Sequence, residues 1–370
     1  MEEKTKQKVP QIRFKGFAGE WEEKKIKDIC SISTGKSNTQ DRVEDGLYPF
    51  YVRSPVIERS NRFLYDEEAV LTVGDGVGTG KVFHYVNGKY DLHQRVYRMF
   101  DFDDGTDGKY FYYFFSNHFY DRVMAMTAKT SVDSVRLEMI SEMDIQLPSK
   151  REQTSIVSVF AELDQMITLH QRKHEKLVTL KKAMLKKMFP APGATIPEIR
   201  FKGFSEPWEE KTLEELVDLR SGRDYKHLSF GNIPVYGTGG YMLSVDQALS
   251  YDENAVGIGR KGTIDKPYLL KAPFWTVDTL FYAVPKGDND LNFVFDIFQQ
   301  IDWKQRDEST GVPSLSKVTI NNVQVLSTTP EEQQIIGAYF RQLDELTAQH
   351  GAQVEKLKQL KTACLEKMFV

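Results

Sequence analysis

Two long stretches of the chain place apolar residues at steps of three and four, the spacing of one face of an α-helix. The first has Ile156, Phe160, Leu163, Ile167, Leu177, Leu180, Met184 and Met188, and the second has Ile336, Phe340, Leu343, Val354, Leu357, Leu360, Cys364 and Met368. Pro148 and Pro330 stand where a helix can begin, and Pro190 closes the first stretch. The pattern predicts two helices of about 38 residues, each roughly 57 Å long.

A narrow apolar stripe on so long a helix is typical of a coiled-coil seam. We expect the two helices to pack on each other through Ile156, Phe160, Leu163, Leu177, Leu180, Ile336, Phe340, Leu343, Leu357 and Leu360. His170 and His350 fall on the same stripes and are expected at the seam or the surface rather than as metal ligands. The alternative is that the helices merely clamp one globular body.

The sequence contains an internal duplication. The run Ile-Arg-Phe-Lys-Gly-Phe occurs at 12–17 and again at 199–204, and residues 151–189 align without gaps with 331–369. Both long stretches end in Lys-Met-Phe, and the Pro/Gly-containing residues 191–195 read as a linker. The predicted order is a globular domain (1–148), a helix (149–190), the linker (191–195), a second domain (196–328) and a second helix (329–370).

The globular halves contain short runs typical of strands, bounded by Gly and Asp turns. These runs are 69–73, 95–99, 255–258 and 279–284, and helical stretches are expected at 110–126 and 293–303. The fold class is therefore α+β: two globular domains, related by a pseudo-two-fold axis and separated by two long antiparallel coiled-coil helices. The halves share landmarks but differ strongly between them, as expected of one scaffold that carries different recognition loops.

Composition adds little to this architecture. Apolar residues make up 40% and charged residues 28%, and the formal net charge is −4. A lone basic DNA-binding module would be positive, so any contact with DNA must come from local basic patches or be shared with a partner. Only Cys30 and Cys364 are present, which favours a reducing cytoplasm over a disulfide framework. The charged N-terminus is unlike a signal peptide, and no apolar run is long enough to cross a bilayer.

Catalytic motifs are missing from the sequence. The run 74–81 suggests a phosphate-binding loop, but Asp75 stands where the Walker pattern needs Gly, and Val82 where it needs Ser or Thr. A turn that carries Lys81 toward DNA, or an ordinary turn, fits better. The lysines of 173–187 are most simply a solvated face, although they could meet phosphates or an acidic partner.

These features together resemble the specificity subunit of type I restriction–modification systems. The resemblance rests on Pro-x-Ile-Arg-Phe-x-Gly-Phe before a Trp at both starts, on Thr-Gly-Val-Pro-Ser-Leu at 310–315, on Glu-Gln at 152–153 and 332–333, and on His-Gln-Arg-Val at 93–96. The first half departs from this pattern at 130–135, where Gly and Pro are replaced.

The resemblance implies two target-recognition domains that each read one half of a split DNA sequence, and a helical spacer that sets the gap. It also implies that two modification subunits dock on the spacer and bring S-adenosylmethionine and adenine methylation. Restriction subunits with ATP and magnesium could join them. The chain itself would bind no cofactor and no metal and would not be an enzyme.

Arg and Lys favour guanine in the major groove, and Asn and Gln favour adenine, so the candidates for DNA contact are mainly residues of these types, with one His and one Tyr. They are Lys36, Asn38, Arg53, Arg59, Asn61, Arg62 and Lys81 in the first domain, and Arg223, Lys226, His227, Tyr241, Arg260 and Lys261 in the second. Two other functions stay open: a coiled-coil-spaced adaptor that binds proteins, and a stand-alone nuclease or methyltransferase with degenerate motifs.

Overall fold

The computed structural model describes residues 9–76, 78–127 and 134–370. The chain divides into two compact units. The first unit comprises residues 1–169 and 353–370, and the second comprises residues 170–352. Both long helices, α4 (Lys150–Met188) and α8 (Pro330–Met368), therefore contribute one part to each unit. Among the described residues, no helix is both long and apolar enough to cross a membrane.

The first unit is built on a six-stranded sheet of order β2-β7-β5-β6-β3-β4, with β1 and β8 paired separately. Its remaining elements are short helices and the longer α2. The bounds are β1 (Glu22–Lys25), α1 (Ile26–Ile29), β2 (Ser31–Thr34), η1 (Thr39–Asp41), β3 (Tyr48–Tyr51), β4 (Ile57–Ser60), β5 (Tyr65–Val73), β6 (Phe83–Leu92), β7 (Val96–Phe100), α2 (Gly108–Ala125), α3 (Leu137–Ser141) and β8 (Asp144–Leu147).

The second unit repeats this plan with its sheet divided into β10-β16-β13-β14 and β12-β11-β15, and with β17 paired to β9. The bounds are β9 (Glu209–Thr212), α5 (Leu213–Leu216), β10 (Val217–Ser221), β11 (Phe230–Gly237), β12 (Gly240–Val245), β13 (Ala255–Gly259), β14 (Tyr268–Leu270), β15 (Trp275–Thr276), β16 (Leu280–Pro285), α6 (Leu291–Gln300), η2 (Trp303–Arg306), α7 (Lys317–Asn321) and β17 (Gln324–Ser327).

The sheet of the second unit is divided because one of its strands is interrupted. In the first unit, β6 pairs with β5 along most of its length and with β3 at its end, so the sheet is continuous. In the second unit, the corresponding strand is broken between β14, which pairs with β13, and β15, which pairs with β11. The predicted strands at 69–73, 95–99, 255–258 and 279–284 are confirmed as β5, β7, β13 and β16.

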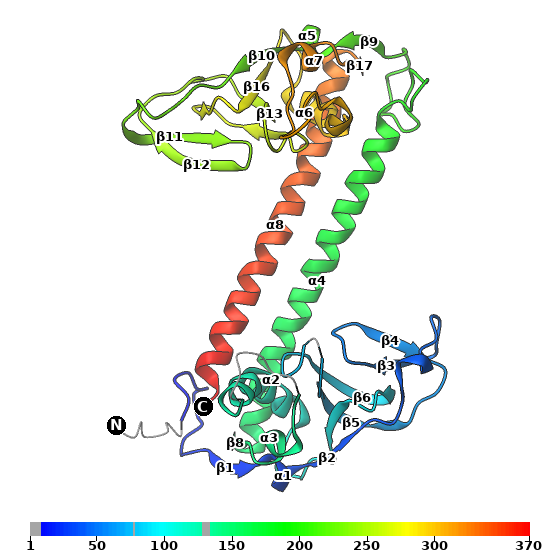
Figure 1. The fold of residues 1–370 in the computed structure, drawn as a ribbon, viewed down its shortest axis with the longest axis vertical. Coiled ribbons are helices and arrows are strands. Elements are labelled where there is room, and N and C mark those ends of the chain that lie inside the picture. Colours follow the sequence, from blue (N-terminus) through cyan, green and yellow to red (C-terminus); the bar gives the residue numbers. More distant parts are fainter. Residues whose placement is uncertain (1–8, 77, 128–133) are drawn as a thin grey trace. The chain divides into compact units, whose positions relative to one another are not determined.

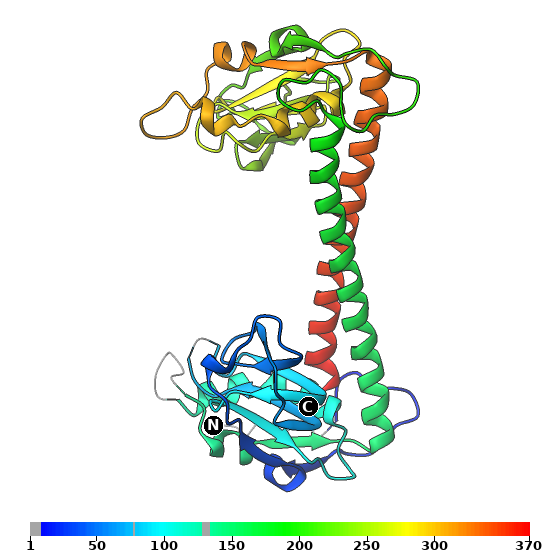
Figure 2. The same cartoon turned by 90° about the vertical axis from the view of Figure 1, so that its right-hand side faces the viewer.

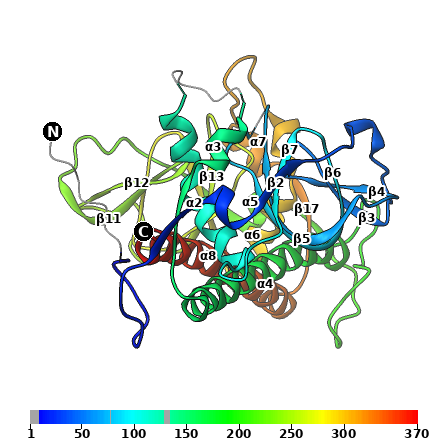
Figure 3. The same ribbon diagram turned by 90° about the horizontal axis from the view of Figure 1, so that it is seen from below.

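Helix α2 lies between the sheet and the long helices of the first unit (Figure 3). Asp107 caps its first turn by accepting from the backbone N–H groups of Lys109 and Tyr110. Phe111, Phe115 and Phe119 recur every four residues and stack on one another, with Phe83 of β6 at 5.6 Å from Phe115. In the second unit, Asp290 caps α6 in the same way.

The ends of the long helices are exchanged between the two copies of the repeat. Phe369, which ends the second copy, packs 5.3 Å from Tyr110 of the first globular domain. Phe189, which ends the first copy, packs 5.4 Å from both Trp208 and Phe293 of the second. Each globular core therefore includes the end of the helix that belongs to the other copy.

The helices run antiparallel within each unit, where they lie side by side (Figures 1 and 2). In the second unit, Lys181 of α4 bonds Asp344 of α8 at 2.7 Å, and His170 lies further back on α4, opposite His350. In the first unit, Lys361 bonds Asp164 at 2.5 Å. The alignment of the repeats pairs Lys181 with Lys361 and Asp344 with Asp164, so both ion pairs are the same contact made twice, as in an isologous interface.

The residues predicted to pack between the helices differ in burial. Ile156, Phe160, Leu163, Ile336, Phe340 and Leu343 are buried, and Leu177 and Leu357 are partly buried. Leu180 and Leu360 are 39% and 49% exposed. A step of four residues from Leu177 or Leu357 leads to Lys181 or Lys361, and these lysines take the place that faces the partner helix.

His170 and His350 meet at the seam, as expected. Their Nδ1 atoms are 2.9 Å apart, so one ring donates and the other accepts. Partial burial, together with the positive charges of His170, Lys173 and His174, lowers the pKa of His350. Among the described residues, no group of three or more His, Cys, Asp or Glu side chains could hold a metal ion.

The repeated sequence motifs also have a structural role. Arg13 and Arg200, from the two Ile-Arg-Phe-Lys-Gly-Phe runs, form bidentate ion pairs with the buried Glu152 and Glu332 at 2.7–2.8 Å. The backbone N–H of Ile12 donates to the carbonyl of Lys367 at 2.9 Å, and that of Ile199 donates to the carbonyl of Lys187 at 2.8 Å. Each repeat start is thus joined to the end of a long helix.

Candidate nucleic-acid interface

Loops at one edge of the first sheet are tied together by backbone hydrogen bonds. Gly35 N–H donates to the Val96 carbonyl, and Gln94 N–H donates to the Ser37 carbonyl at 2.8 Å. His93 N–H donates to the Tyr51 carbonyl, and Gly74 N–H donates to the Arg95 carbonyl at 2.8 Å. These bonds gather the exposed or partly exposed side chains of Lys36, Asn38, Arg53, Gln94 and Arg95 on one surface.

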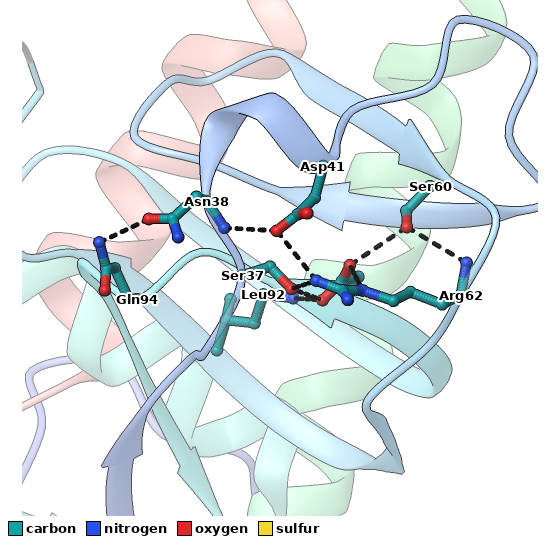
Figure 4. Close-up of polar contacts among 8 residues, drawn as sticks. Ser37, Asn38, Asp41, Ser60, Arg62, Leu92 and Gln94 are labelled. Atoms are coloured by element: carbon teal, nitrogen blue, oxygen red, sulfur yellow. Dashed lines mark hydrogen bonds and ion pairs between the residues drawn. The ribbon is translucent and has the colours of Figure 1, made fainter.

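A buried carboxylate braces these loops (Figure 4). Asp91 is 0% exposed and accepts from Ser37 Oγ at 2.5 Å, from Ser60 Oγ at 3.1 Å and from the Leu92 N–H at 2.8 Å. Arg62 reaches it from the surface, bonding Asp41 at 2.9 Å and Ser37 Oγ at 3.0 Å. Because a buried charge is stable only when it is paired and hydrogen-bonded, this cluster fixes the loop that carries Asn38.

An amide pair lies above the cluster. Gln94 Nε2 donates to Asn38 Oδ1 at 2.6 Å at the surface, and the backbone N–H of Asn38 donates to Asp41 Oδ2 at 2.8 Å. Arg62, which the sequence placed among the base readers, is therefore tied into the support beneath this pair.

Two arginines share one carboxylate beside the amide pair. Arg53 Nη1 is 3.1 Å and Arg95 Nε is 3.7 Å from opposite oxygens of Asp75. Both guanidinium groups are exposed at the surface. Lys81 lies beyond Asp75, 4.5 Å above the Tyr120 ring.

The other first-domain candidates lie on the β3–β4 side. Arg59 donates to the carbonyls of Gly46 at 2.9 Å and Leu47 at 3.2 Å, so its guanidinium holds the chain before β3. Asn61 is exposed between Ser60 and Arg62.

The second unit has the same loop frame. Gly222 N–H donates to the Leu280 carbonyl, Arg223 N–H to that of Thr276, Val277 N–H to that of Tyr236, and Arg260 N–H to that of Thr279, at 2.8–3.0 Å. These bonds match those of Gly35, Lys36, His93 and Gly74 in the first unit.

The side chains on this common frame differ. Arg223 stands where Lys36 does, but Arg260 and Lys261 take the places of Gly74 and Asp75. The second surface thus has two adjacent cations where the first has a carboxylate.

The run 310–315 holds the turn that carries Arg260. Gly262 N–H donates to the Pro313 carbonyl at 2.8 Å, and Leu315 N–H donates to the Arg260 carbonyl at 2.9 Å. The Asp307 side chain accepts from the N–H groups of Ser309 and Ser314, which lowers its pKa. In the first unit, Val135 N–H donates to the Gly74 carbonyl at 2.7 Å. The replaced residues 130–133 lie outside the described residues, but Ser134 and Val135 dock as their counterparts do.

The remaining second-domain candidates are spread over a loop and a hairpin. The loop holding Lys226 and His227 is tied down where Trp275 Nε1 donates to the Arg223 carbonyl at 2.8 Å. Tyr241 is exposed on the β11–β12 hairpin, where its hydroxyl lies 3.2 Å from Ser244 Oγ.

Sequence reasoning missed Gln94, Arg95 and the 90% exposed Phe230 as surface candidates. The run at 93–96 was noted only as a family marker, although it carries the first two. Phe230 begins β11 and left no periodic signal.

Comparison with known proteins agrees with this architecture. A family model described as the type I restriction modification DNA specificity domain matches residues 18–179 and 205–359, once for each repeat. The specificity subunit of the type I restriction enzyme EcoDI from Escherichia coli is 22% identical over 397 aligned positions, covering 95% of this chain and 88% of that protein. The MjaVIII specificity subunit from Methanocaldococcus jannaschii is 24% identical over 225 positions, 57% of this chain and 52% of that protein.

Among solved structures, the S subunit of a type I restriction–modification system from M. genitalium has the same fold. The TM-score is 0.80 at 18% identity, with 98% of this chain and 99% of that chain covered.

Proposed function

Because the chain belongs to the type I restriction–modification specificity family and is the non-catalytic DNA target-specificity subunit of such a system, we propose that each globular half reads one part of an asymmetric, two-part DNA sequence. The observation that carries this proposal is the shared loop frame. Equivalent backbone bonds present Lys36, Asn38 and Gln94 in one unit and Arg223, Arg260 and Lys261 in the other. One frame with different side chains would read different bases.

The same loops supply cations for the phosphates that flank each half-site. Phosphate contacts position a protein on the duplex, and base contacts specify the sequence. Arg53, Lys81 and Lys226 are exposed and suit the first role. These local charges reconcile DNA binding with the net charge of −4.

The helices offer docking surfaces that the two repeats make twice. Leu180 and Leu346 are exposed in the second unit beside the Lys181–Asp344 pair, and Met166 and Leu360 are exposed in the first unit. The latter lie beside the Lys361–Asp164 pair in the same way. Two identical partners need equivalent surfaces, so we place one modification subunit on each.

The cofactors of the complex belong to those partners in this proposal. S-adenosylmethionine would be bound by the modification subunits, and ATP and magnesium by restriction subunits where these are present. The complex would act on DNA in the cytoplasm, and the long helices would set the gap between the half-sites.

The test is an exchange of one recognition domain. Replacing residues 18–148 with the corresponding domain of another family member should change one half-site and leave the other half-site and the gap unchanged. Single-molecule sequencing of methylated adenines, in cells that also express the modification subunits, reads out all three. A change in both half-sites would reject separate reading by the two halves, and an adaptor for proteins would produce no sequence-specific methylation.

A further inference from the structure

The amide pair of the first unit presents a defined hydrogen-bonding pattern to solvent. Gln94 Nε2 donates to Asn38 Oδ1 at 2.6 Å, which leaves the amide hydrogens of Asn38 as donors and Gln94 Oε1 as an acceptor. If both amides were turned over, Asn38 would donate to Gln94 and the free groups would again be one acceptor and one set of donors. Either assignment therefore presents one acceptor and one set of donors, with the places of the two exchanged.

The pair is held in place before any ligand arrives. Gln94 N–H donates to the Ser37 carbonyl at 2.8 Å, and Asn38 N–H donates to Asp41 Oδ2 at 2.8 Å. Ser37 is itself 0% exposed and donates to the buried Asp91. Both amides thus project from backbone that is anchored to a buried carboxylate, which reduces the ordering that binding would require.

Adjacent donor and acceptor groups match one base edge better than the others. In the major groove, adenine offers the N7 acceptor beside the N6 donor, whereas guanine offers two acceptors. Cytosine offers a donor alone, and thymine an acceptor and a methyl group. A phosphate is a poor match because the exposed amide oxygen would face its negative charge.

We infer that Asn38 and Gln94 act together as one adenine-reading pair in the half-site recognised by the first unit. The inference rests on the proposed function and deepens it, because it names the base and the atoms. The free amide group donates to N7, and the free amide oxygen accepts from N6. Ser37, Asp91 and Arg62 are positioning residues in this arrangement, and they touch no base.

The frame of the second unit offers a natural contrast. In the second unit, the position equivalent to Gln94 holds Asp278, which is exposed and acidic. A carboxylate only accepts, so the second unit cannot present the same pattern from this site. We therefore expect the adenine contact in one half-site only.

Atomic substitution in the DNA tests the inference on the assembled complex with its modification subunits. Each adenine of the target is replaced in turn by 7-deazaadenine, which lacks the N7 acceptor and keeps base pairing. For the wild-type complex, one position in the first half-site should lower affinity by roughly 5- to 150-fold, the range for a bidentate base contact. In the Gln94→Ala and Asn38→Ala variants, the same substitution should have little further effect.

Asn87→Ala provides the matched control, since Asn87 is an exposed amide in the middle of β6. It should keep the full sensitivity to 7-deazaadenine. Methylation mapping of the Gln94→Ala variant should show that one adenine of the first half-site becomes any base, while the second half-site and the gap remain. Melting curves of each variant confirm that the loops stay folded.

The outcomes distinguish a failure of the proposed function from a failure of the adenine-reading pair. A wild-type complex that methylates no two-part sequence would overturn the proposed function. A two-part sequence whose 7-deazaadenine sensitivity is unchanged by Gln94→Ala and Asn38→Ala would overturn the adenine pair alone. Relaxation at a guanine or a pyrimidine, or a loss of affinity that is equal for all sequences, would also overturn it.

Discussion

Asp296 shows how a single buried side chain links stability to pH. It lies on α6, is 1% exposed, and its Oδ2 has no hydrogen-bond partner among the described residues. Burial raises its pKa to about 9, although the charge of Lys181 acts in the opposite direction. An unfolded Asp titrates near pH 3.9. Between these pH values the Asp296 carboxyl is ionised in the unfolded chain and protonated in the folded chain. The free energy of unfolding therefore falls as pH rises from about 4 to about 9.

We therefore expect Asp296→Asn to stabilise the second unit at neutral pH. The amide keeps the shape and removes the cost of protonating the carboxylate, so the free energy of unfolding at pH 7.5 should rise by at least about 1 kcal/mol. At pH 4.5 the change should be much smaller. Denaturant unfolding at both pH values measures this, with the exposed Asp252→Asn as the control. An equal effect at both pH values would contradict the raised pKa.

At the residue scale, the sequence supplied candidates by residue type but not the contacts that they make. Lys81, Arg260 and Lys261 were candidates because cations in Gly-containing turns are a local signal. The pairing of Asn38 with Gln94 joins residues 56 positions apart, and no local pattern contains it. The bonds of Arg62 to Asp91 and Ser37 were not predictable for the same reason, since these partners are distant in sequence.

At the scale of elements, the repeated Arg–Glu pairs fasten each globular domain to its long helix. Arg200 makes two bonds to Glu332, whose side chain is 0% exposed, while that of Arg200 is 11% exposed. Removing one partner of a buried ion pair leaves an uncompensated charge, which costs more than the pair itself contributes.

We expect Arg200→Ala to destabilise the second unit by about 3–5 kcal/mol, because it leaves Glu332 buried without its cation. Arg341→Ala is the matched control, since Arg341 forms an exposed pair with Glu345 on the same helix. It should cost less than about 0.5 kcal/mol. Chemical unfolding monitored by tryptophan fluorescence compares the two. Equal costs would show that Arg200 has no special role.

The long helices were the most predictable elements, because their apolar stripe is continuous and their ends are marked by Pro and by Lys-Met-Phe. The structure extends each to 39 residues. The sequence did not indicate the ion pairs of Lys181 with Asp344 and of Lys361 with Asp164, because the partners lie on different helices and are distant in the chain. The break between β14 and β15 was not predictable, since it depends on pairing with distant strands.

For the whole molecule, the gap in the DNA target should depend on helix length. Inserting one helical turn after Leu169 and another after Ala352 keeps the contacts within each unit and lengthens each helix by about 5.4 Å. We expect the non-specific gap to increase and both half-sites to stay the same. Methylation-site sequencing of the doubly extended variant measures the length of the gap. An unchanged gap would mean that the length of the helices does not set it. A variant extended in α4 alone is the control and should assemble poorly.

The order of domain, helix, domain and helix was predictable, because the duplication can be recognised from the sequence alone. The exchange of Phe189 and Phe369 between copies was not predictable, because no local pattern indicates which globular core the end of a helix will pack in. The bases recognised also stay beyond the sequence, since they depend on loops that the duplication does not share.

The two bonds that join a repeat start to a helix end have a topological consequence. Ile199 and Lys187 are bridged by the short linker, whereas Ile12 and Lys367 make the same contact across a break in the polypeptide. Among the described residues, the two repeat starts are thus held to the two helix ends by the same bond. We expect a permuted gene that starts at residue 196 and runs from 370 into residue 9 through a comparable linker to keep both of these bonds.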